Sequence, residues 1–488
     1  MGGATIGLRI IKVFTWIFLA RLLEPSDFGA VALATILIST AKLFSGLGMG
    51  NAVIHSNLDR AKMAFHAFAV TAMTGSILFL LVYTNANLFA GILGDPNISD
   101  MLRWMSIIIL LDTVSLVPEG LLKKDLLFGR VSGALILTDL LHAAVALSLA
   151  YIGFGAWSLI FANLTRASFN VVFLWILTPG WDWIVLKRWN QGIVKSLLQF
   201  GVMSSASGLV SFFNHNWDDW LVGRMIGSTA LGFYNRAYVF TNQTLTGFNG
   251  VIGSVLFPSY AKIQDDKARL SRAYLKSLRL FSLLTVPLAM GTTIITPEIV
   301  PVLLGDKWIP MVTVMQIMAM LGMIRSLSGT TSSLFSAVGR PGYNFRTGVI
   351  QAVLIVVVAL LLLDRGIAGV AFAVTFAYTI GYGYNIYQIH KILPDTALKV
   401  LPASFPAIAA SILMMGVVQI SKTPLQQWAG GQHTLLTLIL LILIGATVYG
   451  VTLLLTQRSL IEEIIQLLIS TLGLNSKSIF ARKLAVRK

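Results

Sequence analysis

The chain has 488 residues, of which 56% are hydrophobic and 11% are charged. This composition excludes an ordinary soluble globular protein, and the absence of cysteine excludes disulfides, a thiol nucleophile and a cysteine metal site. A net charge of +16 would suggest a nucleic-acid partner for a soluble protein, but in so apolar a chain the positive-inside rule explains it better, and we expect no nucleic-acid binding.

Fourteen segments are apolar enough to cross a bilayer, for which about 20 residues suffice. They lie near residues 4–20, 28–49, 66–90, 102–120, 131–151, 155–177, 193–213, 229–258, 279–304, 309–335, 345–363, 367–390, 400–420 and 434–456. A cleaved signal peptide is the competing interpretation of the first segment, but no small-residue cleavage site follows Arg21. The predicted fold class is therefore an all-α integral membrane protein with about 14 transmembrane helices.

The basic residues predict the orientation of these helices. With the N-terminus inside, the inner segments and the C-terminal tail hold 26 of the 36 lysines and arginines, whereas the outer loops hold six. The positive-inside rule therefore predicts a multi-pass protein of the cytoplasmic membrane with both termini in the cytoplasm.

The most informative stretch is residues 20–51, in which a polar loop leads into an apolar run. Ser26 or Asp27 can cap the helix that follows, because a side-chain oxygen there accepts from the free amides of the first turn. The apolar run, 28–49, contains a single charge, Lys42. Its depth makes a solvated surface position an unlikely explanation for that lysine, so it needs a partner or an aqueous cavity.

The same pattern returns 203 residues later, where Arg21 aligns with Arg224 and Gly29 with Gly232. The outer loops ILGDPNISD (92–100) and LLGDKWIP (303–310) are also equivalent, at an offset of 211. A six-helix unit ends on the side of the membrane where it began, so the two halves are predicted to be parallel repeats.

The predicted domains follow from these repeats. They are an N-terminal six-helix lobe at 1–190, a C-terminal six-helix lobe at 191–395, two further helices at 396–458, and a cytoplasmic amphipathic helix with a basic tail at 459–488. Such a tail should favour anionic lipid, so membrane lipids are expected partners.

Four cations lie inside predicted helices: Lys42, Arg166, Arg236 and Arg325. A charge near mid-membrane costs about 2.5–3.5 kcal/mol even on lenient insertion scales. Asp112 and Asp139 lie deep enough to be partners or ion-coupling sites. In one interpretation these charges only hold helices together. In the other, an excess of cations lines a cavity for an anionic group, and arginine suits bidentate phosphate recognition.

The segment FFNHNWDDWLVGR (212–224) is predicted to be an outer loop that opens the second repeat. Asn216, Asp218 and Asp219, beside tryptophans, make a surface that could contact a glycan. An ordinary interfacial loop with aromatic residues is the alternative that we favour. His215 has no second histidine at metal-binding spacing, so no metal site is expected.

The sequence contains no catalytic motif. No outer loop is long enough for a folded catalytic domain, and no GxxxxGK[ST] pattern occurs. We therefore expect no enzyme activity, no cofactor and no ATP hydrolysis by this chain.

The runs ARLLEPSDFG, FSGLGMGNAVI, DDWLVGRMIGSTALGFYNRAY and LFPSYAKIQDD resemble the polysaccharide transporter family of the MOP flippase superfamily. The similarity is greatest to its colanic-acid and teichuronic-acid exporter-like branch, and it covers nearly the whole chain. The resemblance implies a two-lobe fold of 14 helices that alternates between inward- and outward-facing states. It also implies a bacterial inner-membrane flippase for undecaprenyl-pyrophosphate-linked oligosaccharides in the synthesis of exopolysaccharide, O-antigen or capsule.

In that setting the buried cations would meet the pyrophosphate, and the two further helices at 396–458 could form a groove for the lipid tail. Polysaccharide polymerase or assembly proteins are candidate partners. Three alternatives remain. A cation-coupled drug antiporter of the same superfamily should show acid-rich helices, a membrane polymerase or ligase needs a long outer loop, and a scaffold would tolerate replacement of the buried cations.

Overall fold

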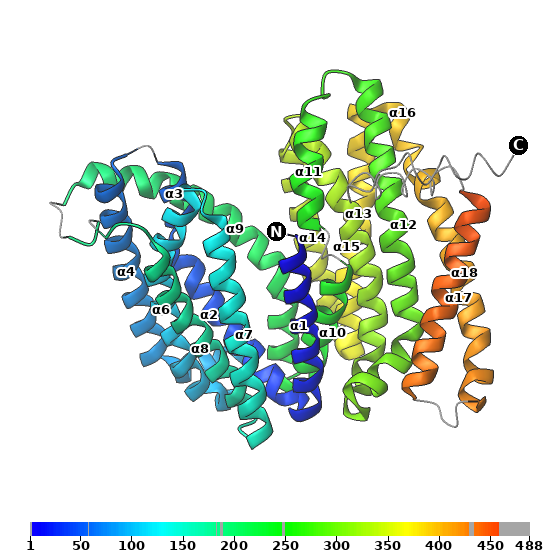
Figure 1. The fold of residues 1–488 in the computed structure, drawn as a ribbon, viewed down its shortest axis with the longest axis horizontal. Coiled ribbons are helices and arrows are strands. Elements are labelled where there is room, and N and C mark those ends of the chain that lie inside the picture. Colours follow the sequence, from blue (N-terminus) through cyan, green and yellow to red (C-terminus); the bar gives the residue numbers. More distant parts are fainter. Residues whose placement is uncertain are drawn as a thin grey trace, which may run out of the picture. The chain divides into compact units, whose positions relative to one another are not determined.

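The computed structural model describes residues 2–56, 58–181, 183–185, 189–245, 249–428 and 434–457. Every regular element within these ranges is helical, which confirms the all-α prediction for this part of the chain (Figure 1). The predicted amphipathic helix and basic tail at 459–488 lie outside the described residues.

The helices of the first half are α1 (Gly2–Leu22), α2 (Pro25–Gly46), α3 (Met49–His55), α4 (Arg60–Thr84), α5 (Ala86–Leu93), α6 (Ser99–Lys124), α7 (Phe128–Ile152), α8 (Ala156–Leu177) and α9 (Gln191–Met225). They are followed by α10 (Ser228–Leu245), α11 (Asn249–Ala261), α12 (Lys267–Ile299), α13 (Val312–Ala337), α14 (Gly342–Leu361), α15 (Gly366–Ile392), α16 (Pro394–Ala397), α17 (Val400–Trp428) and α18 (Leu435–Thr456). Short 3-10 or π turns complete the set: η1 (Pro96–Ile98), η2 (Val300–Leu304), η3 (Asp306–Met311) and η4 (Leu363–Arg365).

Eleven helical stretches among these residues are long and apolar enough to cross a membrane, so the chain is a multi-span membrane protein. The other three predicted segments, near 4–20, 193–213 and 229–258, coincide with α1, with α9, and with α10 and α11. The count of 14 membrane crossings remains a prediction.

The chain forms two compact units. Unit 1 contains the chain up to Val239 together with Leu303–Val314 and Gly348–Ala377, and unit 2 contains Phe240–Val302, Met315–Thr347 and the described chain from Tyr378 onward. The predicted division into two lobes at residue 190 follows from the equivalence of the two sequence repeats, and it stays a prediction.

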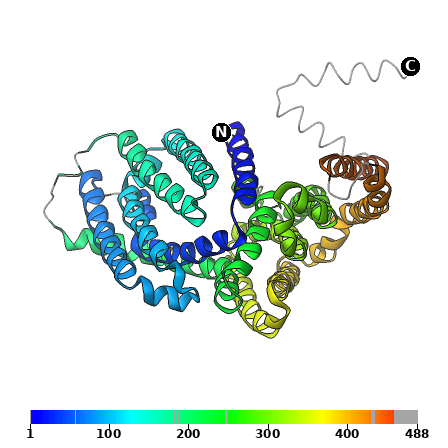
Figure 2. The same ribbon diagram turned by 90° about the horizontal axis from the view of Figure 1, so that it is seen from below.

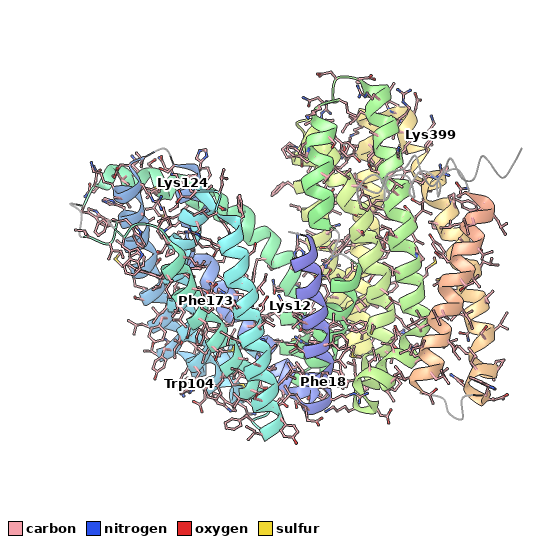
Figure 3. The ribbon with its side chains drawn as sticks, in the orientation of Figure 1. Lys12, Phe18, Trp104, Lys124, Phe173 and Lys399 are labelled. Carbon is pink, nitrogen blue, oxygen red and sulfur yellow. The ribbon has the colours of Figure 1, made fainter. Side chains whose placement is uncertain are left out.

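Helix α2 is central to the packing of unit 1, because it contacts α4, α6, α8 and α9. Helix α7 packs on α8 and also receives α1, whose Lys12 is marked beside α7 in Figure 3. These contacts bring polar side chains of α1, α2, α6, α7 and α8 into one region.

The start of α2 is held by Asp27, as the sequence suggested, although Glu24 rather than Asp27 is the N-cap residue. The Asp27 carboxylate accepts from the Glu24 backbone N–H at 2.9 Å and from the Ala156 N–H at 3.1 Å. One side chain therefore satisfies an amide at the beginning of α2 and another at the beginning of α8.

Helices α2 and α10 cross with their backbones in contact. A Cβ added at Gly29 would lie 1.7 Å from the Ser228 carbonyl oxygen, and one added at Gly232 would lie 1.8 Å from the Pro25 carbonyl oxygen. The contact is reciprocal between residues that are 203 positions apart in each pair, Pro25 with Ser228 and Gly29 with Gly232. The two copies of the repeated motif therefore meet at a two-fold-like crossing that requires glycine on both helices.

At its other end α2 breaks at Leu47 and Gly48, which both have positive φ angles, of 41° and 64°. A Cβ at Gly48 would lie 2.1 Å from the Gly201 carbonyl oxygen of α9. The backbone is thus in close contact with α10 near one end of α2 and with α9 just beyond the other end.

Unit 2 is built around α12, which packs on α17 and α18. Helices α17 and α18 lie side by side and are seen nearly end-on in Figure 2. A buried ion pair joins Lys422 of α17 to Glu298 of α12 at 2.9 Å, with side-chain exposures of 12% and 5%. Because a broken buried pair leaves an uncompensated charge, this pair ties α12 to α17.

Candidate functional site

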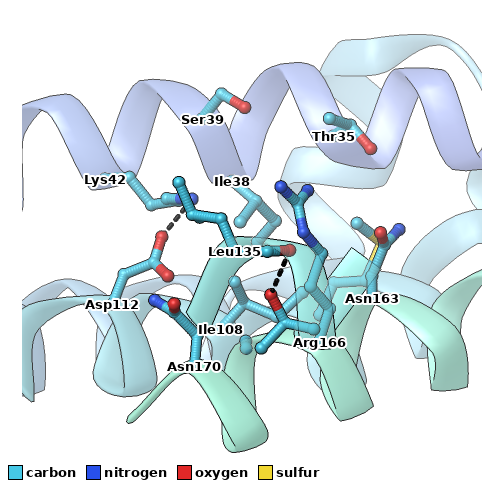
Figure 4. Close-up of a pocket in the computed structure, with 13 residues that line it drawn as sticks. Thr35, Ile38, Ser39, Lys42, Ile108, Asp112, Leu135, Asn163, Arg166 and Asn170 are labelled. Carbon is cyan, nitrogen blue, oxygen red and sulfur yellow. Dashed lines mark hydrogen bonds and ion pairs between the residues drawn. The ribbon is translucent and has the colours of Figure 1, made fainter. Parts of the chain in front are cut away.

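A polar cavity of about 340 Å³ lies in unit 1 between α2, α6, α7 and α8 (Figure 4). We call it the cationic cavity. It is lined by Thr35, Ile38, Ser39, Lys42, Met105, Ile108, Asp112, Leu135, Thr138, Asn163, Arg166, Ala167 and Asn170. Two of the four predicted cations and one of the two predicted acids therefore meet in one place.

Lys42 and Asp112 form an ion pair across this cavity, and Figure 4 shows their side chains facing each other. The lysine is 39% exposed and the aspartate 26% exposed. Lys42 thus has the carboxylate partner that its depth requires, and its side chain lines the cavity.

Arg166 lies beside a second carboxylate, Asp139, which it shares with a third helix. Its Nε atom is 3.0 Å from Asp139 Oδ1, and Lys12 Nζ of α1 is 2.8 Å from Asp139 Oδ2. Asp139 is only 10% exposed, whereas Arg166 is 44% exposed. The acid therefore lies behind the cations, and in Figure 4 the terminal nitrogens of Arg166 point towards α2 with no hydrogen-bond partner among the residues drawn.

Arg236 lines a second cavity of about 250 Å³, which we call the arginine cavity. Its guanidinium carbon lies 4.8 Å from the centre of the Phe28 ring and 5.6 Å from that of Trp16. Its Nη2 donates to Asn235 Oδ1 at 2.7 Å, while its buried Nε has no hydrogen-bond partner in the described part of the chain. The aromatic rings hold the guanidinium by cation–π contact and leave a donor available.

The two cavities are neighbours, because Thr35 and Asn163 line both of them. Together they place Lys42, Arg166 and Arg236 along one polar region of unit 1. Three cations and two carboxylates, Asp112 and Asp219, line this region. The balance of these charges remains positive, although the excess is one cation here and was two in the sequence analysis, which counted four cations and two acids.

The predicted outer loop at 212–224 is wrong, because α9 continues as a helix to Met225. Asp218 and Asp219 are 5% and 7% exposed. The Tyr234 hydroxyl donates to Asp218 Oδ2 at 2.6 Å, and Asn235 Nδ2 donates to Asp219 Oδ2 at 2.8 Å. The helix can continue because its acids find donors on α10 rather than in water.

This burial also changes the predicted glycan-contact set. Asp218 is turned into the α9–α10 packing, while Asp219 and Asn216 line the arginine cavity. Among the described residues Asp219 Oδ1 has no hydrogen-bond partner, so it can accept from a bound polar group or from water. A glycan contact by Asn216 or Asp219 stays a prediction.

Arg325 belongs to unit 2, where it packs on Tyr378 of α15. Its guanidinium carbon lies 4.3 Å from the centre of the Tyr378 ring, and its Nη2 donates to the Tyr378 hydroxyl at 3.0 Å. A role for Arg325 beside the other three cations remains a prediction.

Uncharged residues of the site were missed by the sequence analysis. Asn163 and Asn170 lie three and four positions from Arg166 on one face of α8, and Thr35 and Ser39 share a face of α2 with Lys42. Spacings of three and four residues place side chains on one side of a helix, so this polar face could have been found. Asn170 Oδ1 is buried and has no partner within the described ranges, so it is a further acceptor beside the cations.

The described residues contain no group of three or more histidine, aspartate or glutamate side chains that could hold a metal ion. The polar region of unit 1 presents guanidinium, ammonium, amide and hydroxyl groups together with the carboxylates of Asp112 and Asp219 and the imidazole of His142. Its cationic and neutral donors can bind and orient an anion by charge-assisted hydrogen bonds.

A sequence model of a family described as polysaccharide biosynthesis protein matches residues 18–313. The lipopolysaccharide biosynthesis protein WzxC of Escherichia coli K12 is 24% identical over 72% of this chain and 70% of its own length. The succinoglycan biosynthesis transport protein ExoT of Rhizobium meliloti is 25% identical over 95% of this chain and 92% of its own.

The fold is similar to that of several solved structures. The lipid II flippase MurJ in an inward closed conformation gives a TM-score of 0.76 at 15% identity, covering 94% of this chain and 99% of its own. A multidrug resistance MATE family transporter of the MOP superfamily, in an inward-facing conformation, gives 0.63 at 15% identity over 79% and 95%. At this identity the likeness concerns the fold alone.

Proposed function

Since the chain belongs to the polysaccharide biosynthesis protein family, we propose that it is a flippase that moves undecaprenyl-pyrophosphate-linked oligosaccharides from the inner to the outer leaflet of the bacterial cytoplasmic membrane. The names of the relatives WzxC and ExoT concern the biosynthesis of lipopolysaccharide and the biosynthesis and transport of succinoglycan. The proposed process is therefore surface polysaccharide biosynthesis.

The observation that carries this proposal is the polar region of unit 1 that holds Lys42, Arg166 and Arg236. A pyrophosphate loses much of its hydration when it enters a membrane protein, and this costs several kcal/mol unless cations and donors replace the water. Arg236 Nε has no hydrogen-bond partner among the described residues, and in Figure 4 the terminal nitrogens of Arg166 have none among the residues drawn. A guanidinium can donate two parallel hydrogen bonds to a phosphate, which a drug cation would not need.

Alternating access completes the proposal. The fold is similar to inward closed and inward-facing structures of other transporters, and the two-fold-like crossing of α2 and α10 joins the two copies of the repeated motif. Asp112 and Asp139 are the carboxylates we propose for ion coupling, because each neutralises a cavity cation that a bound anion would also contact. Binding of the anion would weaken these ion pairs and leave the carboxylates open to a proton or a metal cation.

We further propose that both termini lie in the cytoplasm, that the chain carries out no chemical step, and that polysaccharide polymerase or assembly proteins receive its product. The basic residues of the predicted inner loops support the orientation. The transporter names among the relatives support the absence of catalysis.

Complementation of a gene deletion tests the proposal. We expect Arg166→Ala and Arg236→Ala to insert normally but to lose surface polysaccharide, with lipid-linked repeat units trapped on the inner leaflet. Arg103→Ala is the matched control, because Arg103 lies on α6 in an exposed pair with Asp100 and lines neither cavity. Normal polysaccharide from both cavity variants would contradict an anion site there.

Arg325→Ala in the same assay tests the cation of unit 2. Loss of polysaccharide at a normal membrane level would support a role for Arg325 in binding or transport. A normal level of polysaccharide would show that the contact with Tyr378 is structural.

A further inference from the structure

A second, apolar hollow lies beside the polar region of unit 1. It has a volume of about 650 Å³ and lies between α2, α9 and α14. We call it the aromatic groove. It is lined by Ile36, Thr40, Phe212, Phe213, Asn214, Asn216, Trp217, Trp220, Val349, Ala352 and Val353.

Aromatic rings form one wall of this groove. The rings of Phe213 and Trp217 are stacked with their centres 4.9 Å apart, and the rings of Trp217 and Trp220 are 4.8 Å apart. Residues three or four positions apart share a helix face, so α9 presents a continuous aromatic surface across the groove. The valines of α14 and Ile36 of α2 complete an aliphatic lining.

The groove has few polar groups, and several of their hydrogen bonds are made within the protein, while Asn214 Oδ1 and Trp217 Nε1 have no hydrogen-bond partner among the described residues. Asn214 Nδ2 donates to the Gly348 carbonyl at 3.4 Å, and Asn216 Nδ2 donates to the Phe212 carbonyl at 2.8 Å. A sugar placed here would leave several hydroxyl groups without partners, and each such loss costs free energy. A hydrocarbon chain has no such groups to lose, so the lining favours a lipid chain over a glycan.

The groove is open rather than filled by the protein. Val353 is 57% exposed, and Phe213 and Val349 are each 42% exposed. Exposed apolar side chains beside an aromatic wall, in a chain that lies in a membrane, provide a surface that a lipid chain can cover.

The groove is continuous with the cation-lined region. Ile36 and Asn216 line both the aromatic groove and the arginine cavity, and the arginine cavity in turn shares Thr35 with the cationic cavity. A single ligand could therefore place an anionic group near Arg236 and an attached hydrocarbon chain along α9 and α14. A molecule with this division is an anionic lipid whose charge is concentrated at one end.

We propose that the aromatic groove holds the part of the polyisoprenoid chain that adjoins the pyrophosphate of the lipid-linked substrate. This inference rests on the proposed function. It places this part of the polyisoprenoid at α2, α9 and α14 rather than at α17 and α18, the two C-terminal helices that the family resemblance suggested for the lipid tail. The branched isoprene units fill the space between the rings of α9 and the valines of α14, while the glycan extends from the other end of the pyrophosphate.

Photolabelling of the full-length protein in nanodiscs tests this placement. The probe is geranylgeranyl diphosphate with a diazirine on its chain, and unlabelled geranylgeranyl diphosphate is the competitor. We expect competed labelling of residues 212–220 and 349–353. Val353→Trp should fill the groove and lower this labelling about tenfold, since displacing a few methylenes removes that much affinity. Val357→Trp is the matched control, because Val357 is 48% exposed on the same helix and does not line the groove.

Each outcome decides the point. Competed labelling that maps to α17 and α18, or that survives Val353→Trp, overturns the groove assignment and leaves the proposed function intact. Protection of the groove by a soluble sugar pyrophosphate without lipid, lost in Val353→Trp, would assign the groove to the glycan and overturn the inference. If the unlabelled diphosphate competes nowhere, only nonspecific lipid contact remains, and the anion site and proposed function fail together with it.

Discussion

The crossing of α2 and α10 provides a sharp test of the packing. In Gly29→Ala the new Cβ would lie 1.7 Å from the Ser228 carbonyl oxygen. An unstrained contact between a carbon and a carbonyl oxygen needs about 3.3 Å, so the two backbones must separate by roughly 1.6 Å. Overpacking within a core costs about 1–3 kcal/mol, and the obstacle here is backbone that cannot rotate away. We therefore expect a loss of about 3 kcal/mol in the free energy of unfolding.

The reciprocal substitution strengthens this test. Gly232→Ala places a Cβ 1.8 Å from the Pro25 carbonyl oxygen and should cost about as much as Gly29→Ala. One separation of the helices relieves both clashes, so the double variant should lose clearly less than the sum of the two single losses. Simple additivity would mean that the two glycines do not share one contact.

Thermal unfolding of the purified protein, together with its level in the membrane, measures these effects. Gly133→Ala in α7 is the control, because a Cβ there has nothing within 4 Å. That variant should be neutral or more stable by up to about 1 kcal/mol, since alanine favours a helix over glycine. The reasoning is refuted if Gly29→Ala unfolds at the same temperature as the wild type.

Three further predictions concern single side chains. Asp139→Asn should lower the free energy of unfolding by about 3–5 kcal/mol, which is more than Asp112→Asn should, because it removes the partner of two cations from a position only 10% exposed. Equal melting temperatures of the two variants would contradict this. Trp308→Phe should cost about 1–3 kcal/mol, because the indole N–H that donates to the Ala20 carbonyl at 2.8 Å is lost from a fully buried site, and thermal unfolding measures it. Asp27→Ala should cost about 1–2 kcal/mol in the same assay, because the amides at the starts of α2 and α8 both lose their acceptor; no loss would show that water replaces the carboxylate.

The sequence was sufficient to predict the helical class, most of the membrane spans and the pairing of deep charges. A lysine inside an apolar run needs a partner or an aqueous cavity whatever the fold, so an ion pair such as that of Lys42 with Asp112 could be expected before any contact was known. The offset of 203 residues also predicted that Gly29 and Gly232 play equivalent roles, and the structure places them against each other.

The remaining features depend on tertiary contacts that local pattern does not contain. The polar run at 212–224 reads as a loop because two adjacent aspartates are costly in a helix within a membrane, and hydrogen bonds from Tyr234 and Asn235 on α10 lower that cost. The sharing of Asp139 between Lys12 and Arg166 depends on how α1 packs against α7, which no spacing along one helix reveals.

Transport by the purified protein in proteoliposomes tests the central claim most directly. The measurement is the rate at which a lipid-linked oligosaccharide becomes accessible to an impermeant sugar-modifying reagent. We predict a rate well above that of protein-free liposomes, reduced about tenfold or more by Arg166→Gln with Arg236→Gln, because each loses a charge-assisted hydrogen bond worth about 1.5–3 kcal/mol. Arg103→Ala should keep the wild-type rate. A wild-type rate equal to that of empty liposomes would contradict the flippase assignment, and an unimpaired double variant would contradict the anion site.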